Sequence, residues 1–353
     1  MKFASAASIL LAFVAVAPAG ATDLPDGTLI SSEPCEPMRD MTHALYLKRQ
    51  KLAVSREMTL AEREGIAMPP IADKLLAKGL LTEDELDERL AYEGFECREI
   101  RYASAGLEIA GFLWKPVDTT GEALPLIIAN RGGNRDFGGM AAWMNWGWYD
   151  FLKAGYVVLA SQYRGGPGSE GEDEFGGDDV DDVRALIPLA ESLGYVDMDN
   201  VFAFGGSRGG MMTYQFAKGD SPLRAFSIQA GVSDLWRNVR NRPGFEDMYA
   251  EMMPDYHEQG REAALTRRSA SKWAGEIKVP GIIFHGSGDW RVDPQDAVDV
   301  AEGMRAAGTP VELHLYYGDT HAITLNHADM MRHTLAFFER FRTGPDMPAG
   351  GAQ

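Results

Sequence analysis

The sequence predicts an α/β fold, in which a mostly parallel sheet carries helices on both faces. Two observations predict it: short apolar runs recur from about residue 99 onward, and segments with helical spacing separate most of them. Strands that alternate with helices form parallel sheets, because the chain must cross over before two of its strands can pair in parallel. With 353 residues, of which 45% are hydrophobic and 24% charged, the chain is long enough for one large domain and an appendage.

The expected strands and helices follow this alternation in order. A hairpin is expected over residues 100–102 and 107–114, with its turn at Ala105-Gly106. The later strands are expected at 126–129, 156–160, 201–204, 225–228, 281–284 and 313–316. The helices are expected at 180–192, 208–218, 296–307 and 327–342. Because such sheets place their sites at the carboxyl ends of strands, functional residues are expected in the loops that follow the strands.

The segment before this main domain reads as a polar, helical appendage. We expect the appendage over residues 22–95, the main domain over 96–343 and a flexible tail over 344–353. Apolar residues at 41–53 have helical spacing. Two further helix starts are expected from the capping-box pattern, in which a threonine precedes a glutamate by three residues: Thr59 with Glu62, and Thr82 with Glu85.

The first 21 residues have the pattern of a signal peptide. Lys2 supplies a positive charge, residues 9–16 form a short apolar run, and Ala19-Gly20-Ala21 offers the small residues of a cleavage site before Thr22. An uncleaved membrane anchor is the alternative. No other stretch approaches ~20 apolar residues, so we expect an exported protein, periplasmic or secreted, that has no membrane contact after cleavage.

The two cysteines agree with export. Cys35 and Cys97 both lie in the expected mature part, where an oxidising compartment would let them form a disulfide that ties the appendage to the main domain. Two unrelated buried thiols are the alternative. Neither cysteine has a second Cys or His at ligand spacing, and no metal site is expected.

The net charge bears on partners rather than on chemistry. It is −18 at pH 7 with neutral histidines, and such a surface repels phosphate backbones. Nucleic acid is therefore not expected as a partner. The sequence indicates no oligomeric state.

The stretch Gly205-Gly206-Ser207-Arg208-Gly209 joins an expected strand directly to an expected helix. A serine at the apex of so sharp a turn needs glycines two residues before and two after it, because strand and helix crowd together there. Such a turn exposes the Ser207 hydroxyl as a nucleophile and aims the Arg208 amide at a developing oxyanion. A glycine-rich turn with an incidental serine is the alternative.

A serine nucleophile needs a base that is oriented by a carboxylate. Asp289 follows the expected strand at 281–284 and His321 follows the next strand, so the chain order is Ser, Asp, His, as in the α/β-hydrolase fold. The competing acids and histidines have other expected roles, such as helix starts, loop ordering and packing: Asp293, Asp296, Asp319, His285, His327 and His333.

These segments together resemble the catalytic domain of the prolyl oligopeptidase family over residues 99–343. The resemblance is carried by residues 205–210, 277–292 and 318–321, with further similarity at 163–166 and 230–234. It implies an α/β-hydrolase fold, Ser207 as the nucleophile, Asp289 rather than Asp293 as the orienting acid, and His321 as the base. No cofactor is implied.

The sequence departs from this family in two places. Where family members have a Tyr-Gly-Gly or His-Gly-Gly-Pro segment, this chain has Asn130-Arg131-Gly132-Gly133-Asn134, so a tyrosine hydroxyl donor to the oxyanion is missing. The second donor is then expected to be a backbone amide of this loop, at Gly132 for example, or Arg131 itself. Family peptidases commonly carry a β-propeller as well, which the residues at 22–95 are too few to build. Peptidase specificity therefore does not carry over.

Aromatic residues and acidic runs near the site have two interpretations each. Trp143, Trp146 and Tyr163 are candidates for a substrate pocket, with packing as the alternative. The acidic runs at 170–174 and 178–182 would suit calcium, but the resemblance and helix-start logic favour a solvated loop. Residues 235–273 are expected to form a lid-like insert.

The expected function is a serine hydrolase that works through an acyl-enzyme. The motif set favours a prolyl oligopeptidase-type peptidase acting on short peptides. The missing propeller and the Arg131 change favour a carboxylesterase acting on a small-molecule ester. A non-catalytic binding protein on a hydrolase fold is the third hypothesis, against which the complete Ser, Asp, His set argues.

Overall fold

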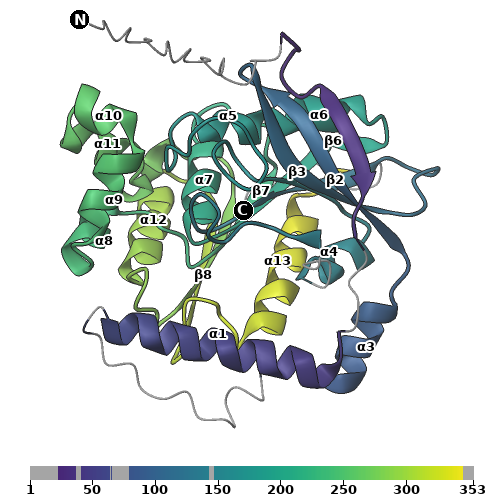
Figure 1. Cartoon of the computed structure of the whole chain (residues 1–353), viewed down its shortest axis with the longest axis horizontal. Coiled ribbons are helices and arrows are strands. Elements are labelled where there is room, and N and C mark those ends of the chain that lie inside the picture. The colour runs from purple at the N-terminus through teal and green to yellow at the C-terminus, as the bar shows by residue number, and fades with distance from the viewer. Residues whose placement is uncertain (1–22, 37–40, 64, 66–78, 143–146, 345–353) are drawn as a thin grey trace, which may run out of the picture.

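The structure is a computed structural model that describes residues 23–36, 41–63, 65, 79–142 and 147–344. Its centre is a nine-stranded sheet in the order β1-β2-β3-β5-β4-β6-β7-β8-β9 (Figure 1). Strands β1, β2, β3 and β5 pair in antiparallel fashion, and all pairs from β5 through β4 to β9 are parallel. The strands are β1 Leu29–Pro34, β2 Phe95–Ser104, β3 Leu107–Pro116, β4 Leu124–Asn130, β5 Val157–Ser161, β6 Val196–Gly206, β7 Ala225–Gln229, β8 Gly281–Gly286 and β9 Val311–Tyr316.

Helices cover both faces of this sheet, as the alternation of strands and helices predicts. Side chains of β4 show why: Leu126 and Ile128 face one apolar cluster, while Ile127 and Ala129 face the other. The described helices are α1 His43–Arg63, α3 Glu83–Ala91, α4 Tyr149–Lys153, α5 Asp179–Arg184, α6 Leu186–Ser192, α7 Arg208–Phe216, α8 Leu235–Asn241, α9 Phe245–Met252, α10 Pro254–Glu258, α11 Arg261–Arg267, α12 Gln295–Ala306 and α13 His327–Phe341. The predicted fold class is confirmed.

Two helix predictions were wrong in detail. The helix expected at 180–192 is divided into α5 and α6. Pro188 has no amide hydrogen to donate to the carbonyl four residues earlier, and its ring crowds that carbonyl, so one continuous helix is disfavoured there. Thr59 lies inside α1 instead of starting a helix, and its hydroxyl donates to the carbonyl of Ser55 at 2.9 Å. At Thr82 the predicted capping box is present and starts α3.

The N-terminal segment contains the predicted helices, α1 and α3, and also a strand that the sequence did not predict. It begins with β1, which pairs with β2 and forms one edge of the sheet. Edge strands bury little of either face, so β1 lacks the alternation by which a strand is predicted. Cys35 follows β1, Cys97 lies in β2, and the two form a disulfide, as predicted.

Helix α1 lies apart from the sheet, along the side of the molecule where α12, α13 and the loops after β8 and β9 end (Figure 1). It is held there partly through residues 79–81: Tyr46 in α1 accepts a hydrogen bond from the Leu81 amide at 3.1 Å, and His43 contacts the Leu81 carbonyl at 3.0 Å. A Cβ atom on Gly79 would lie 2.0 Å from the carbonyl oxygen of Thr324, so the loop that follows His321 touches this segment directly.

No helix within the described residues is long and apolar enough to cross a membrane. The predicted signal peptide at 1–21 and residues 345–353 of the predicted tail lie outside the described residues. The segment predicted as a lid-like insert, 235–273, consists of α8 to α11 and a short 3₁₀ turn, Ala270–Lys272.

Removing the disulfide is expected to destabilise the protein. In the chain-entropy account, the bond limits the unfolded chain, and closing a loop of this length corresponds to about 4 kcal/mol. The double variant Cys35→Ser/Cys97→Ser should therefore lose about that much free energy of unfolding in a urea titration. Reducing agent should shift the wild-type midpoint and leave that of the double variant unchanged. Equal midpoints for wild type and variant would contradict the prediction.

Candidate active site

Ser207 stands at the apex of the turn between β6 and α7, with φ 56° and ψ −124°. The strain of this conformation is held by the neighbouring strand, because the Ser207 amide donates to the Gln229 carbonyl at 3.0 Å. The two flanking glycines are required by space: a Cβ atom at Gly205 would lie 2.3 Å from the Gly209 carbonyl oxygen, and one at Gly209 would lie 2.0 Å from that of Asn130. The turn has the geometry of a nucleophile elbow.

Asp289 and His321 meet at the ends of the adjacent strands β8 and β9. His321 Nδ1 lies 2.8 Å from Asp289 Oδ2. The other carboxylate oxygen accepts the amides of Arg291 and Val292 at 2.8 and 3.1 Å, which fixes the rotation of the carboxylate. His321 is part-buried, with 16% of its side chain exposed. The carboxylate is therefore held in place by the backbone and can orient the imidazole.

A second histidine shares the same carboxylate oxygen. His285 is fully buried at the end of β8, and its Nε2 lies 2.9 Å from Asp289 Oδ2 and 3.1 Å from the Val292 carbonyl. Burial by itself raises the pKa of Asp289, but the neighbouring His321 and the hydrogen bond from His285 outweigh it and hold that pKa below its ordinary value. Asp289 is thus a carboxylate whenever the protein is near neutral pH.

Gln229 at the end of β7 connects the serine turn to the histidine loop. Its carbonyl accepts the Ser207 amide, and its side-chain amide donates to the carbonyl of Ala322, next to His321, at 2.9 Å. No hydrogen bond joins Ser207 to His321 in the described structure. Such contacts are often long before substrate binds. Sequence reasoning missed Gln229, although a polar residue at the end of the strand between the serine and aspartate strands is a usable signal.

The loop after β4 lies against the serine. A Cβ atom at Gly132 would lie 3.1 Å from Ser207 Cβ and 3.7 Å from its Oγ, so a glycine lets this backbone approach the Ser207 side chain. The Arg131 side chain points elsewhere: its guanidinium is buried and donates to the carbonyls of Gln162 at 2.9 Å and Arg135 at 2.8 Å. The Arg131 side chain therefore stabilises the loop through its backbone carbonyls.

The comparison with protein families agrees with this geometry. A family model described as the prolyl oligopeptidase family matches residues 142–343, more than half of the chain. The chain belongs to the prolyl oligopeptidase family. This confirms the resemblance stated from the sequence, and with it the expectation of a serine hydrolase.

Relatives and solved structures of the prolyl oligopeptidase family extend the likeness over most of the described domain. The uncharacterized peptidase YtmA of Bacillus subtilis is 28% identical over 63% of this chain and 84% of its own length. The acylamino-acid-releasing enzyme of Sus scrofa is 26% identical over 62% of this chain and 32% of its own length. The acylaminoacyl peptidase of Pyrococcus horikoshii superposes with a TM-score of 0.61 at 20% identity, over 75% of this chain and 45% of the other. The chain thus spans less than half of two of these three proteins.

The acidic runs of this family member are a solvated loop only in part: Glu172 and Asp178 are exposed and the second run starts α5, as predicted, but three of the aspartates are buried. Asp173 and Asp179 are buried and pair with the fully buried guanidinium of Arg208, and Asp182 pairs with Arg164 at 2.8 Å. Since Arg208 directly follows the serine, the acidic loop anchors the start of α7 next to Ser207. No cluster of metal-binding side chains is found among the described residues.

Replacing Arg208 with methionine is expected to destabilise the protein strongly. The change leaves Asp173 and Asp179 buried without their cation, and breaking a buried pair on one side costs about 3–5 kcal/mol. Urea unfolding measures this directly. The matched control is Arg184→Met, because Arg184 is about half exposed and pairs with Asp181 on the surface. A similarly small loss in both variants would overturn the anchoring role.

The remaining candidate residues fall into three groups. Tyr163 is fully buried and its hydroxyl donates to the Arg131 carbonyl at 3.2 Å, so it packs behind the loop and offers no surface to a substrate. Trp143 and Trp146 lie outside the described residues. The competing acids serve backbone amides: Asp296 accepts those of Ser233 and Asp234, Asp293 that of Gln295, and Asp319 those of Thr320 and Asn326.

A cavity of about 250 Å³ opens at Ser207. Its walls come from α1, the loop after β4, the turn at the start of α7, helices α8 and α9, and the loop after β8. The lining residues include Leu60, Phe137, Phe175, Val232, Arg242, Phe245, Tyr249 and Arg291. Most of these described lining residues are apolar, and Arg208, Arg242 and Arg291 add positive charge beside Ser207.

Proposed function

We propose that this protein is a serine peptidase that cleaves short peptides through an acyl-enzyme at Ser207. The observation that carries the proposal is the strained Ser207 turn, tied through Gln229 to the loop of an Asp289–His321 pair. Ser207 Oγ attacks the carbonyl carbon while His321 takes its proton, and Asp289 stabilises the imidazolium that forms. The proton then passes to the leaving amine, and water releases the acyl group by the same steps.

The developing oxyanion is held by backbone amides in this proposal. The amides of Arg208 and Gly132 donate no hydrogen bond to any described residue, and both lie beside Ser207. Two preorganised amides supply the donors that such a site needs, and each is worth about 10²-fold in rate or more. Because the Arg131 guanidinium donates to carbonyls of its own loop and to that of Gln162, we assign the second donor to the Gly132 amide.

A carboxylesterase is the second candidate function. The observation that favours it is the Asn130 to Gly133 segment, where a tyrosine hydroxyl is absent. An ester carbonyl is easier to attack than an amide, so weaker oxyanion stabilisation limits ester cleavage less. Residues 235–273 form part of the cavity wall through Asn238, Arg242, Phe245 and Tyr249, which supports a lid role for this segment in either function.

The deciding experiment compares short acyl nitrophenyl esters with aminoacyl and dipeptidyl nitroanilides, with Ser207→Ala as the blank. For a peptidase we expect anilide turnover that depends on Ser207 and is comparable to ester turnover. Ester cleavage without anilide cleavage would establish the esterase. Turnover of neither, together with no labelling by a fluorophosphonate probe, would indicate a binding protein instead.

We also propose that the protein is exported. The Cys35–Cys97 disulfide supports this, because such bonds persist in oxidising compartments, and the sequence pattern at 1–21 supports it independently. Mass spectrometry of the protein recovered from its native compartment should give Thr22 as the N-terminal residue. An intact Met1 in a cytoplasmic fraction would contradict export.

A further inference from the structure

A buried histidine that the proposed mechanism does not use contacts the same carboxylate as the proposed base. His285 lies in β8 with its side chain fully buried, and its Nε2 is 2.9 Å from Asp289 Oδ2. His321 Nδ1 is 2.8 Å from that same oxygen and keeps 16% of its side chain exposed. One carboxylate oxygen therefore joins an imidazole inside the protein to the imidazole at the proposed active site.

The surroundings of His285 determine which of its ring nitrogens carries the hydrogen. Nε2 faces two acceptors, Asp289 Oδ2 and the Val292 carbonyl at 3.1 Å, so it must donate. Nδ1 is buried and has no hydrogen-bond partner among the described residues. A hydrogen on Nδ1 would be a buried donor without an acceptor, which is costly. These contacts therefore favour a neutral ring that donates through Nε2.

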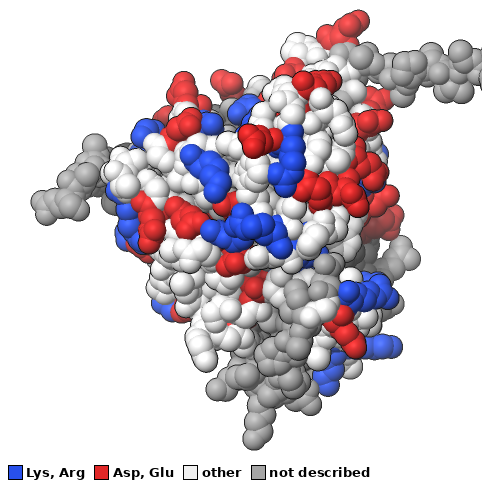
Figure 2. Space-filling view, turned by 90° about the vertical axis from the view of Figure 1, so that its left-hand side faces the viewer, with Lys and Arg blue, Asp and Glu red and all other residues white. Residues whose placement is uncertain are grey.

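The buried Asp289 carboxylate depends on such donors for its charge. The charged side chains on the face shown in Figure 2 are interspersed and open to solvent, whereas none of the Asp289 side chain is exposed. Oδ1 accepts the amides of Arg291 and Val292, and Oδ2 contacts the two histidines. A carboxylate that accepts more hydrogen bonds is a weaker base and attracts a neighbouring imidazolium less strongly. The donor on His285 thus weakens the attraction between Asp289 and the imidazolium form of His321.

We propose that His285 is a positioning residue of this serine hydrolase: its Nε2 hydrogen bond holds Asp289 Oδ2 against His321 and makes His321 a weaker base. A weaker base stays neutral down to a lower pH, and only the neutral ring can take the proton of Ser207. The hydrogen bond from His285 therefore extends hydrolysis toward acidic pH. This inference rests on the proposed chemistry at Ser207.

The other groups around this carboxylate stay unchanged when His285 is replaced. Burial raises the pKa of Asp289, and the titratable groups that outweigh burial are His321, in the loop after β9, and His285 in β8. The described charged residues that line a cavity together with Asp289 are Arg291, Asp293 and Asp296. A substitution at His285 therefore removes one donor to the carboxylate and leaves the charges around it in place.

Two substitutions of nearly equal size separate the hydrogen bond of His285 from its packing. Glutamine places an N–H donor as many bonds from the backbone as Nε2, whereas methionine has the same length without a donor. The test variants are therefore His285→Gln and His285→Met. The control is His314→Met on the neighbouring strand β9. His314 pairs with Glu312 at 3.5 Å and makes no hydrogen bond or ion pair with Asp289 or His321 within the described part of the chain.

The measurement is kcat and KM as a function of pH on the best nitroanilide or ester, with the rate of labelling by a fluorophosphonate probe as a second readout. For His285→Met we expect the acidic limb of kcat/KM to move about one pH unit higher, which makes hydrolysis on that limb about tenfold slower. His285→Gln and His314→Met should keep the wild-type limb. KM should stay unchanged, since His285 is not among the described residues that line the Ser207 cavity.

Identical acidic limbs in His285→Met and His285→Gln would overturn the inference, because packing alone would then account for the histidine. A wild type that neither turns over substrate nor reacts with the probe would instead refute the chemistry at Ser207, and the inference with it. Because a buried substitution can prevent folding, wild-type protein with ¹⁵N-labelled histidine gives an independent test. After backbone assignment, NMR should place the hydrogen of His285 on Nε2 at every pH of the profile. A hydrogen on Nδ1 instead of Nε2 overturns the inference.

Discussion

Ser207→Ala is expected to reduce kcat by about 10⁵- to 10⁶-fold, the loss seen when a serine nucleophile that acts together with its base is removed. The reason lies in the turn between β6 and α7, which presents this hydroxyl beside the Arg208 and Gly132 amides. The measurement is steady-state hydrolysis of the best ester or nitroanilide, with mass-spectrometric mapping of a fluorophosphonate adduct.

The control for this variant is Ser192→Ala. Ser192 ends α6 and is not among the described lining residues of the Ser207 cavity, and its hydroxyl donates to the carbonyl of Leu189. Wild type and Ser192→Ala should both be labelled at Ser207 and turn over substrate at similar rates. An adduct on another residue, or full activity in Ser207→Ala, would remove the basis of the proposed mechanism.

Asp289→Asn is expected to lower kcat by about 10⁴-fold with little change in KM. The Asp289 oxygen that contacts His321 Nδ1 also contacts His285, so a carboxylate acceptor at this point selects the tautomer of both rings. The asparagine amide can turn its NH₂ group toward His321 Nδ1. The neutral ring then carries its proton on Nε2, the nitrogen that should accept the proton of the serine. The measurement is kcat and KM on the same substrate as for wild type.

Asp293→Asn is the matched control, because Asp293 lies four residues further along the same loop and was the competing candidate. Its carboxylate accepts the amide of Gln295 and a hydrogen bond from Asn241, and it contacts no histidine among the described residues. Its activity should stay within a few-fold of wild type. A large loss in Asp293→Asn with a small loss in Asp289→Asn would reassign the acid.

The Asp289 variant should also change how stability depends on pH. Because the pKa of Asp289 is below its ordinary value of 3.8 in the folded protein, the unfolded chain binds protons here more readily. The stabilisation from this group is therefore complete above about pH 4 and is lost as the pH falls toward the folded-state pKa. Asp289→Asn should lose less of its free energy of unfolding than wild type between pH 5 and pH 3.

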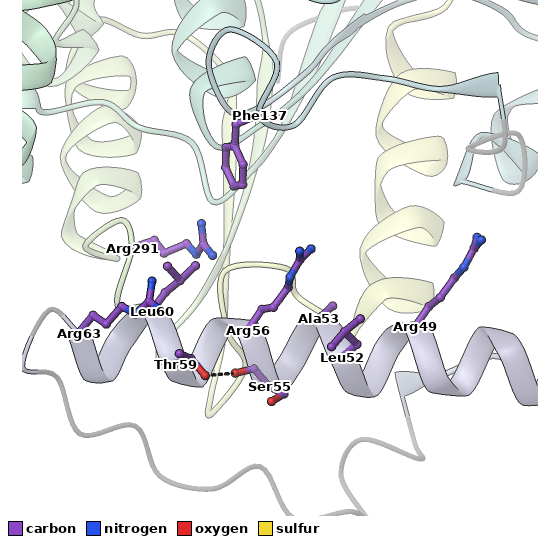
Figure 3. A pocket seen from close by; sticks show the side chains of 10 residues that line it. All are labelled: Arg49, Leu52, Ala53, Ser55, Arg56, Thr59, Leu60, Arg63, Phe137 and Arg291. Carbon is purple, nitrogen blue, oxygen red and sulfur yellow. Dashed lines mark hydrogen bonds between the residues drawn. The ribbon is translucent and has the colours of Figure 1, made fainter.

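Helix α1 lies next to the proposed active site. It contributes Leu60 to the cavity at Ser207, and its residues Arg49, Arg56 and Arg63 line a second cavity that shares Leu60, Phe137 and Arg291 with the first (Figure 3). Its neighbours at 79–81 touch the loop that carries His321. A segment outside the matched family region thus forms part of the cavity wall at Ser207.

The sequence by itself determined the alternation of strands and helices, the turn at Ser207 and the pairing of Asp289 with His321. These follow from local rules: apolar strand runs, helical spacing, and glycines where strand and helix crowd, as at Gly205 and Gly209. The parallel sheet then brings the ends of β6, β8 and β9 to one edge. The chain order of the three residues was sufficient to expect this.

Only the tertiary structure decided which polar residues are buried together and what lies over the site. From the sequence, Asp173 and Asp179 were expected at the surface, because the sequence does not show which basic residue pairs with them. Their ion-pair partner, Arg208, belongs to α7. The same holds for the edge pairing of β1, for the bridge through Gln229 and for the arginines of α1 that line the second cavity. Such contacts depend on distances between segments far apart in the chain, whereas sequence patterns report the environment of a residue only along its own helix or strand.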